Sequence, residues 1–350
     1  MKICFTLSSL AAGGAERVAV SLANSFSRNG HDVTLLLVSI DHNNSFYDIN
    51  EDVKVIPLLK SKSDKNPFRR IRLLKRELLS LKPDIVISFL PHICIYTYFA
   101  LRKTSIPFIC SERNDPNKYN FLYKFLLKKS FHKANGAVFQ TEDAKKFYLN
   151  SLSGKNCIIP NPVFLTLSSP IVSKKEKDKL FISVGRLTDQ KNFPLLIESF
   201  TEFHKNHKDF NLFIYGEGPK RPELEKLISE LNLNDCVSLP GTCKTWHDVA
   251  LNATAFISSS NYEGMPNCLE EALCLGCKCI ATDCPVGGSK LLINDLGNGI
   301  LIPTNNKTSL VDAMNSIIRK NETALPSYTK YKVETVANLW IDFINEVLKK

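Results

Sequence analysis

The chain has 350 residues, 44% of them apolar, which is typical of a globular protein too long for one ordinary hydrophobic core, so we expect two domains. Its net charge of +10 arises in the first half, since residues 1–170 hold 24 Lys and Arg against 13 Asp and Glu, whereas residues 171–350 hold 21 against 22. A basic half predicts an acidic partner: we favour a membrane surface or a phosphorylated acceptor over nucleic acid, and a merely solvated basic surface is the alternative.

The cysteine pattern argues against disulfides and against a zinc site. The 11 cysteines cannot all pair within the chain, and most stand in apolar runs, as expected of buried, reduced thiols in a cytosolic protein. Cys274, Cys277 and Cys279 lie close together, but no second ligand cluster accompanies them, so we expect no metal.

The N-terminal sequence and the longest apolar stretch predict neither a signal peptide nor a spanning helix. Met1–Leu7 runs directly into a glycine turn without a cleavage site. The stretch Ile85–Leu101 contains Pro91 and His92, which favours a buried strand followed by a helix over a membrane span.

The first half opens with an apolar strand, a glycine turn at Gly13-Gly14, and a helical pattern that ends at Gly30. This order of strand, helix and strand predicts a parallel sheet. The turn lacks the spacing of a dinucleotide fingerprint, but two glycines before a helix let a ligand approach the backbone; a tight turn without a ligand is the alternative. Strands are expected at Lys2–Leu10, His31–Val38, Val53–Pro57, Asp84–Phe89, Phe108–Ser111 and Ala137–Thr141, the last closing the sheet.

Two segments of this half combine basic and apolar side chains. Arg69–Arg76 belongs to an amphipathic helix whose stripe is Ile71, Leu74, Leu78 and Leu81, and Phe121–Lys133 mixes aromatic and basic residues. Such segments can lie on anionic lipid, although a helix that covers the sheet with a solvated basic side would show the same pattern.

The connector Ile158–Val163 carries two prolines around Asn161, and the alternation of strands and helices then restarts. We expect domains at residues 1–165 and 166–326, each an α/β, doubly wound, Rossmann-like parallel sheet. The second-half strands are expected at Lys179–Val184, Phe210–Tyr215, Val237–Leu239, Ala253–Ile257, Cys279–Thr282 and Gly299–Ile302, and the helices at Phe193–His204, Glu223–Leu231, Leu310–Arg319 and Val333–Leu348.

The most informative stretch follows the predicted strand Ala253–Ile257. Pro266 fits the first position of a short helix, and Gly276 fits its left-handed end. Ligands bind at this strand-to-helix edge of a parallel sheet, and the backbone N–H groups of Met265, Asn267 and Cys268 suit an anion. A carboxylate stands on each side of that cradle, at Glu263 and Glu271.

The segment from Glu263 to Glu271 resembles the E-x7-E signature of retaining family 4 glycosyltransferases of the GT-B fold, and Gly13-Gly14-Ala15-Glu16-Arg17 is similar to a string common in them. The resemblance covers essentially the whole chain. It implies two Rossmann-like domains that face each other across a cleft, with a last helix, within residues 327–350, that crosses back to the first domain.

The resemblance also implies roles for individual residues. Arg186 and Lys191 would bind the donor diphosphate, Glu271 the ribose hydroxyls, and Glu263 the transferred sugar; solvated loop cations are the alternative for the first two. Relatives have a segment similar to Ser111–Asn114, some with His where this chain has Arg113, which here suits phosphate binding or bracing. The implied catalytic residues are Glu263, Arg186 and Lys191; the donor-binding residues Gly14, Gly185, Arg186, Lys191, Gly216, Glu263, Gly264, Met265, Pro266, Asn267 and Glu271, with Gly287 and Gly288 beside them; the acceptor or cleft residues Gly13, Arg17, Glu112, Arg113 and Asn114.

The function implied by the resemblance is the transfer of a hexose or N-acetylhexosamine from a nucleotide diphospho-sugar to a lipid-linked saccharide in cell-surface polysaccharide synthesis. No Asp-x-Asp occurs, so we expect no metal and no other cofactor. We expect a uridine donor, although the sequence does not separate uridine from guanosine, and a cytoplasmic enzyme on the inner face of the membrane. A nucleotide-sugar epimerase and a non-enzymatic phosphoglycan-binding protein are the alternatives.

Overall fold

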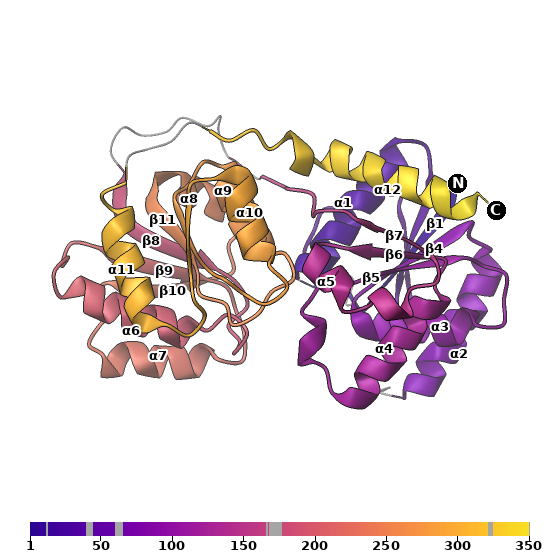
Figure 1. Ribbon diagram of the computed structural model, residues 1–350, viewed down its shortest axis with the longest axis horizontal. Coiled ribbons are helices and arrows are strands. Elements are labelled where there is room, and N and C mark those ends of the chain that lie inside the picture. The colour runs from indigo at the N-terminus through magenta and orange to yellow at the C-terminus, as the bar shows by residue number, and fades with distance from the viewer. Residues whose placement is uncertain are drawn as a thin grey trace. The chain divides into compact units, whose positions relative to one another are not determined.

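The computed structural model describes residues 1–11, 13–39, 45–59, 66–165, 167, 177–320 and 325–349. The chain forms two compact units, Met1–Pro162 with Thr329–Lys350, and Val163–Tyr328 (Figure 1). We refer to them as the first and the second unit. The expected boundaries, residues 165 and 326, lie close to these.

The first unit is a seven-stranded parallel sheet in the order β3-β2-β1-β4-β5-β6-β7. The expectation that the strand near Ala137 closes this sheet is wrong, because β7 pairs outside β6. The side chains of β7 are exposed or half-buried, so this edge strand lacks the apolar run that predicts a strand. The strands are β1 (Lys2–Leu7), β2 (Asp32–Leu37), β3 (Lys54–Pro57), β4 (Ile85–Phe89), β5 (Phe108–Ser111), β6 (Gly136–Phe139) and β7 (Lys155–Ile158).

Helices cover both faces of this sheet because alternate strand residues point to opposite sides. Phe5 of β1 packs with α1 (Gly14–Arg28) and α12 (Val333–Leu348), whereas Cys4 packs with the helices of the other face. That face carries α2 (Pro67–Leu81), α3 (Pro91–Leu101) and α4 (Phe121–Lys133). The shorter elements are η1 (Pro116–Lys118), which follows β5 along the chain, and α5 (Glu142–Lys146) and η2 (Leu149–Ser151), which follow β6.

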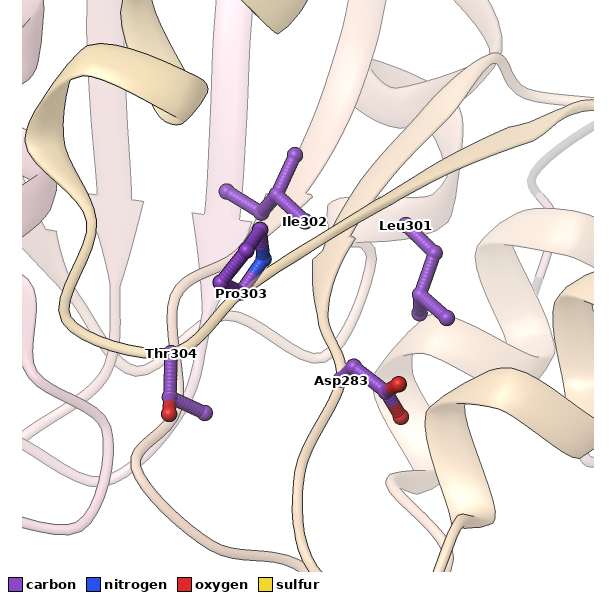
Figure 2. A pocket seen from close by; sticks show the side chains of 5 residues that line it. All are labelled: Asp283, Leu301, Ile302, Pro303 and Thr304. Atoms are coloured by element: carbon purple, nitrogen blue, oxygen red, sulfur yellow. The ribbon is translucent and has the colours of Figure 1, made fainter.

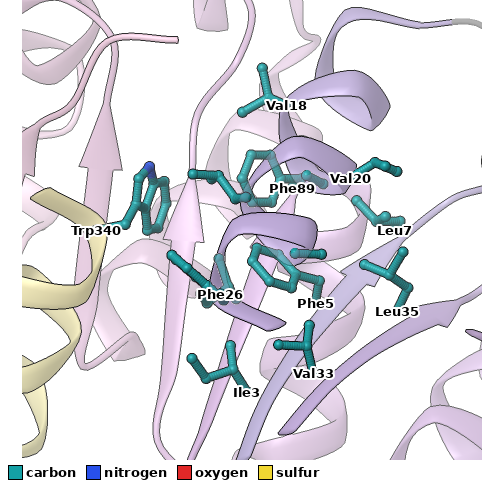
Figure 3. Packing of buried hydrophobic residues seen from close by; sticks show 14 of the residues in the cluster. Ile3, Phe5, Leu7, Val18, Val20, Phe26, Val33, Leu35, Phe89 and Trp340 are labelled. Carbon is teal, nitrogen blue, oxygen red and sulfur yellow. The ribbon is translucent and has the colours of Figure 1, made fainter. Parts of the chain in front are cut away.

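The final helix, which we expected on the first domain, belongs to the first unit. Its Trp340 is fully buried, and the Trp340 and Phe89 ring centroids lie 5.8 Å apart (Figure 3). An indole of this size, buried against a central strand, ties the end of the chain into the first core.

The second unit is a six-stranded parallel sheet in the order β10-β9-β8-β11-β12-β13. Two of its helices, α8 and α10, have no counterpart in our sequence predictions. The elements are β8 (Asp178–Val184), α6 (Phe193–His204), β9 (Asn211–Tyr215), α7 (Arg221–Glu230), β10 (Val237–Gly241), α8 (Trp246–Asn252), β11 (Ala253–Ser258), α9 (Asn267–Cys274), β12 (Cys279–Thr282), α10 (Gly288–Leu296), β13 (Gly299–Ile302), α11 (Lys307–Ile317) and η3 (Thr329–Tyr331), the last belonging to the first unit.

Candidate functional site

The strongest candidate site lies in the second unit, where β8 and β11 end. These strands are neighbours and parallel, so the loops that follow them leave the same edge of the sheet. One loop carries Arg186 and Lys191, and the other carries Glu263 and leads into α9. Sheet topology therefore brings together two segments separated by about seventy residues along the chain.

Glu263 is the centre of this site and is only 7% exposed. Its Oε1 lies 2.7 Å from Nζ of Lys191 and accepts a hydrogen bond of 2.8 Å from the Ser260 hydroxyl. The Gln190 amide donates to Oε2 at 3.3 Å. A buried carboxylate costs free energy unless it is paired, and these donors hold Glu263 in one orientation.

Lys191 keeps its charge in this setting. Burial disfavours the ammonium, but the Glu263 carboxylate outweighs that effect, and the pKa of Lys191 is raised above its ordinary value. Arg186, at the start of the same loop, is exposed. The site thus has one cation paired with Glu263 and a second directed to solvent, an arrangement suited to a polyanionic ligand.

The helix α9 begins one residue later than the sequence indicated. Pro266 is the N-cap residue, with extended backbone angles, and Asn267 is the first helical residue. Gly264, Met265 and Pro266 are buried. At the other end Gly276 has φ +78°, which confirms the expected left-handed residue.

Glycines allow the strand exits to pack backbone against backbone. A Cβ at Gly216, where φ is +139°, would overlap the carbonyl oxygen of Gly185, and one at Gly288 would overlap that of Gly264. The resemblance implied that glycines in these loops let the backbone close on a ligand. In the structure the close approach is between loops of the protein itself, which fixes their relative positions.

Glu271 lies inside α9 and is 1% exposed. Its Oε2 is 3.0 Å from Nε2 of His247, at the start of α8. Sequence reasoning missed His247, since nothing in the stretch Trp246-His247-Asp248 indicates a partner 24 residues away.

In the first unit, Glu112 follows β5 and is 1% exposed. The backbone N–H groups of Arg113 and Asn114 donate to its Oε1 at 3.0 and 3.1 Å, and the Tyr148 hydroxyl donates to Oε2. Burial raises the pKa of Glu112 to about 7, with these hydrogen bonds opposing part of that effect. Its carboxylate therefore fixes the loop to the unit's own interior.

Arg113 is also engaged within the first unit. Its Nε donates to the Ser111 hydroxyl at 2.9 Å, and one terminal nitrogen donates to Oδ1 of Asn161 at 2.5 Å. The guanidinium lies 4.6 Å from the Phe89 ring centroid and 5.6 Å from that of Trp340. These contacts support bracing, the second of the two roles that we assigned to Arg113.

The glycine turn before α1 is held by a side chain. The Tyr47 hydroxyl lies 2.9 Å from both the N–H and the carbonyl oxygen of Gly13. Gly14 is exposed and Arg17 is half-buried in the first turns of α1.

A second histidine that sequence reasoning left without a role stands at this edge of the first sheet. His92 Nε2 lies 2.5 Å from the Ser8 hydroxyl. Burial, and then the charge of Arg70, lowers the pKa of His92 to about 4. The ring is therefore neutral near pH 7. Its position after β4, where a ligand edge is expected, was the available signal.

The second unit also has a pocket of about 370 Å³ where β12 and β13 end, lined by Asp283 and by residues 301–304 (Figure 2). None of the predicted donor residues lines it. A smaller pocket of about 100 Å³ adjoins the Lys191 loop, and its lining includes Asp189, Asn192 and Asn261. We place the candidate site at Glu263 because charged groups converge there.

The remaining predictions concern thiols, metals and membranes. The 11 cysteines are thiols that are not joined in disulfides. Within the described ranges, no group of three or more His, Cys, Asp or Glu side chains could hold a metal ion. None of the helices in those ranges is long and apolar enough to span a bilayer.

Two family models match the chain in succession. The model described as "Glycosyltransferase Family 4" matches residues 12–167, and the one described as "Glycosyl transferases group 1" matches residues 167–332.

Individual proteins agree with the models. An uncharacterized glycosyltransferase of Methanocaldococcus jannaschii is 33% identical over 278 residues, which are 70% of this chain and 68% of that protein. A Campylobacter jejuni protein named as a GalNAc-alpha-(1->4)-GalNAc-alpha-(1->3)-diNAcBac-PP-undecaprenol alpha-1,4-N-acetyl-D-galactosaminyltransferase is 25% identical over 99% of both chains. Among solved structures, Anabaena HepE in complex with UDP and glucose has a TM-score of 0.78 at 15% identity, over 99% of both chains.

Proposed function

The chain belongs to the family 4 glycosyltransferases of the GT-B fold, of the type that builds bacterial polysaccharides, and from this premise we propose a retaining, metal-independent transfer reaction. The donor is a nucleotide diphospho-sugar with uridine as the expected base, and the transferred group is a hexose or N-acetylhexosamine. The acceptor is a lipid-linked saccharide.

The observation that carries this proposal is the contact between Lys191, on the loop after β8, and Glu263, on the loop that leads into α9. In the reaction, an acceptor oxygen bonds to the sugar C1 while the bond from C1 to the diphosphate breaks, and the acceptor proton passes to the departing phosphate. Negative charge develops on that phosphate. Arg186, Lys191 and the N–H groups at the start of α9 would stabilise it, and such preorganised groups are usually the largest catalytic contribution.

Glu263 has a different role in this proposal. Its carboxylate is held by Lys191, Ser260 and Gln190, so it presents a fixed acceptor to hydroxyl groups of the sugar. Such a contact orients C1 relative to the diphosphate-binding cations. Glu271 would bind the ribose hydroxyls, as the resemblance implies.

The acceptor assignment is supported by relatives. The Campylobacter jejuni protein described above is named for a saccharide on undecaprenyl diphosphate, and a second protein of that organism, 26% identical over 99% of this chain, is named as an N-acetylgalactosaminyltransferase that acts on a diphospho-undecaprenol substrate. HepE, which shares the fold, was crystallised with UDP. We therefore propose a lipid-linked saccharide as the acceptor of this chain and UDP as the nucleotide of its donor.

We also propose that the first unit binds the inner face of the membrane through α2 and α4. Both helices pack against α3 and cover the same face of the sheet. Their exposed aromatic residues are Phe68, Phe121 and Phe125, which are 79%, 87% and 55% exposed. Arg69, Arg72 and Arg76 are exposed on α2, next to its apolar stripe, of which only Ile71 and Leu81 are half-buried. Aromatic and basic side chains together suit an anionic bilayer surface.

The test is sugar transfer to a lipid extract. Purified protein is incubated with UDP-glucose, UDP-galactose, UDP-GlcNAc or UDP-GalNAc in the presence of a chelator. Mass spectrometry identifies the product, and NMR determines its anomeric configuration. We expect one donor to give a lipid-linked product with the donor's α configuration. A β-linked product would contradict retention, and activity that returns only with magnesium or manganese would contradict metal independence.

A further inference from the structure

His247 and Glu271 form a buried pair that the proposed mechanism does not yet use. Nε2 of His247 and Oε2 of Glu271 lie 3.0 Å apart, and the two side chains are 1% and 2% exposed. The residues come from different helices, α8 and α9. An ionised carboxylate only accepts hydrogen bonds, so the ring nitrogen that faces it is the protonated one.

The imidazole is held in place from its own helix. His247 is adjacent to Trp246, whose ring centroid is 4.1 Å away, and Trp246 is 3% exposed. The same indole lies 5.7 Å from the ring of Phe256 in β11, which fixes the beginning of α8 to the sheet. The His247 ring therefore has little freedom to rotate away from Glu271.

A buried polar pair of this kind does not obviously serve stability. Apolar side chains of similar volume would usually stabilise the contact between two helices at least as well as a buried ion pair. A defined orientation of one carboxylate is what the pair provides, just as the hydrogen-bonded partner of a metal-binding side chain orients that ligand.

We propose that His247 is a positioning residue for the donor nucleotide. Its Nε2–H holds Oε2 of Glu271, so that the carboxylate meets the two ribose hydroxyls in one orientation. This inference rests on the proposed function, in which Glu271 binds the ribose. It predicts that His247 controls how strongly the protein prefers a ribonucleotide to its 2′-deoxy counterpart.

Two amide variants separate this role from simple packing. In H247Q the side-chain nitrogen occupies roughly the place of Nε2 and still reaches Oε2. In H247N the side chain is one methylene shorter, and its nitrogen stops near the place of Nδ1. Both replacement side chains are polar and no larger than that of histidine. They therefore differ chiefly in how far the amide nitrogen extends toward Oε2 of Glu271.

The experiment measures dissociation constants of UDP and 2′-deoxy-UDP by calorimetry for the wild type and both variants, with GDP and 2′-deoxy-GDP as the parallel pair. We expect the wild type to prefer the ribonucleotide. Compared with the wild type, H247N should bind the ribonucleotide roughly tenfold more weakly, which is the loss expected for one hydrogen bond to a charged group. It should bind the 2′-deoxy form less than twofold more weakly. H247Q should keep most of the preference.

Thermal unfolding shows whether each variant is folded, and H247L replaces H247N if the latter is not. If H247N, or H247L in its place, loses affinity equally for the ribonucleotide and the 2′-deoxy form, or for neither, the pair of His247 and Glu271 is structural. This inference is then overturned while the proposed function stands. If the wild type binds neither UDP nor GDP, the proposed function fails and this inference falls with it.

Discussion

Charged residues follow parallel strands in both units, but the structure uses them in opposite ways. After β5 of the first unit, Glu112 and Arg113 turn inward onto Tyr148 and Asn161 and onto the rings of Phe89 and Trp340. After β8 and β11 of the second unit, Lys191 and Glu263 pair with each other beside the start of a helix, and Arg186 is exposed. A charged residue directly after a strand can therefore either brace the fold or bind a ligand, and the sequence alone does not distinguish the two roles.

The largest effect is expected for the charged residues of the second unit, which we propose bind the donor. We expect Arg186→Ala and Lys191→Ala each to lower turnover by roughly 100- to 1,000-fold, because each removes a positioned cation from the departing diphosphate. Arg186 is exposed, so Arg186→Ala should keep the stability of the wild type, whereas Lys191→Ala leaves the buried Glu263 carboxylate without its cation and should lower stability as well. Steady-state kinetics with the donor found in the transfer assay gives the turnover, and circular dichroism follows folding.

Lys226→Ala is the matched control for those two variants, because Lys226 is an exposed cation on α7 of the same unit. Its turnover should stay within twofold of the wild type. Turnover like that of the wild type in both Arg186→Ala and Lys191→Ala, with folding intact, would exclude this site.

In the first unit, the buried Glu112 should make the free energy of unfolding depend on pH. Burial raises its pKa from the ordinary 4.5 to about 7, so between these values the folded state keeps a proton that the unfolded state releases. Stability contributed by this group is complete below pH 4.5 and is lost as the pH rises through 7. Relative to Glu112→Gln, the wild type should lose up to about 3 kcal/mol over this range.

Urea unfolding at several pH values measures that difference. Taking the difference between wild type and variant cancels the titration of other groups, such as His92, that both proteins share. A constant difference from pH 4 to pH 8 would show that the Glu112 carboxylate does not titrate abnormally.

Arg113→Ala should lower stability by about 2 kcal/mol, because it removes the hydrogen bond to Asn161 and the stacking on Phe89 and Trp340. Nucleotide affinity should stay within twofold, since all the expected donor-binding residues except Gly14 belong to the second unit. Arg113→Lys keeps the charge but not the planar group, so it should recover only part of the stability. A large loss of UDP affinity at unchanged stability would instead make Arg113 a ligand-binding residue.

The smallest effects per residue are expected at the membrane, where each basic side chain near an anionic leaflet contributes roughly 1 kcal/mol and salt weakens the attraction. Changing Arg69, Arg70, Arg72 and Arg76 together to Gln should release the protein from vesicles that contain anionic lipid. Sedimentation with anionic and neutral vesicles, at low and high salt, measures this.

The control removes the same number of charges from the second unit, at the exposed residues Lys205, Lys208, Lys226 and Lys290. This variant should still sediment with anionic vesicles. Equal binding to anionic and neutral vesicles, or no binding to either, would contradict the membrane proposal and leave the basic first unit with another partner.

The sequence by itself determined the two parallel sheets, the approximate positions of nearly all strands along the chain and the position of the Glu263 motif. These features depend on local signals: apolar runs of strand length, glycines at strand exits and the spacing of two carboxylates. The apolar stripe of α2 was also readable, and the structure confirms it, since Leu74 and Leu78 are fully buried.

Only the tertiary structure decided which polar groups meet. Glu112 and Tyr148 are 36 residues apart, His247 and Glu271 are 24 apart, and Lys191 and Glu263 are 72 apart. The edge strand β7 was missed for the same reason, because its pairing with β6 rather than its own apolarity makes it a strand. Periodicity reports burial along one segment, whereas contacts between segments depend on how the sheets order their strands.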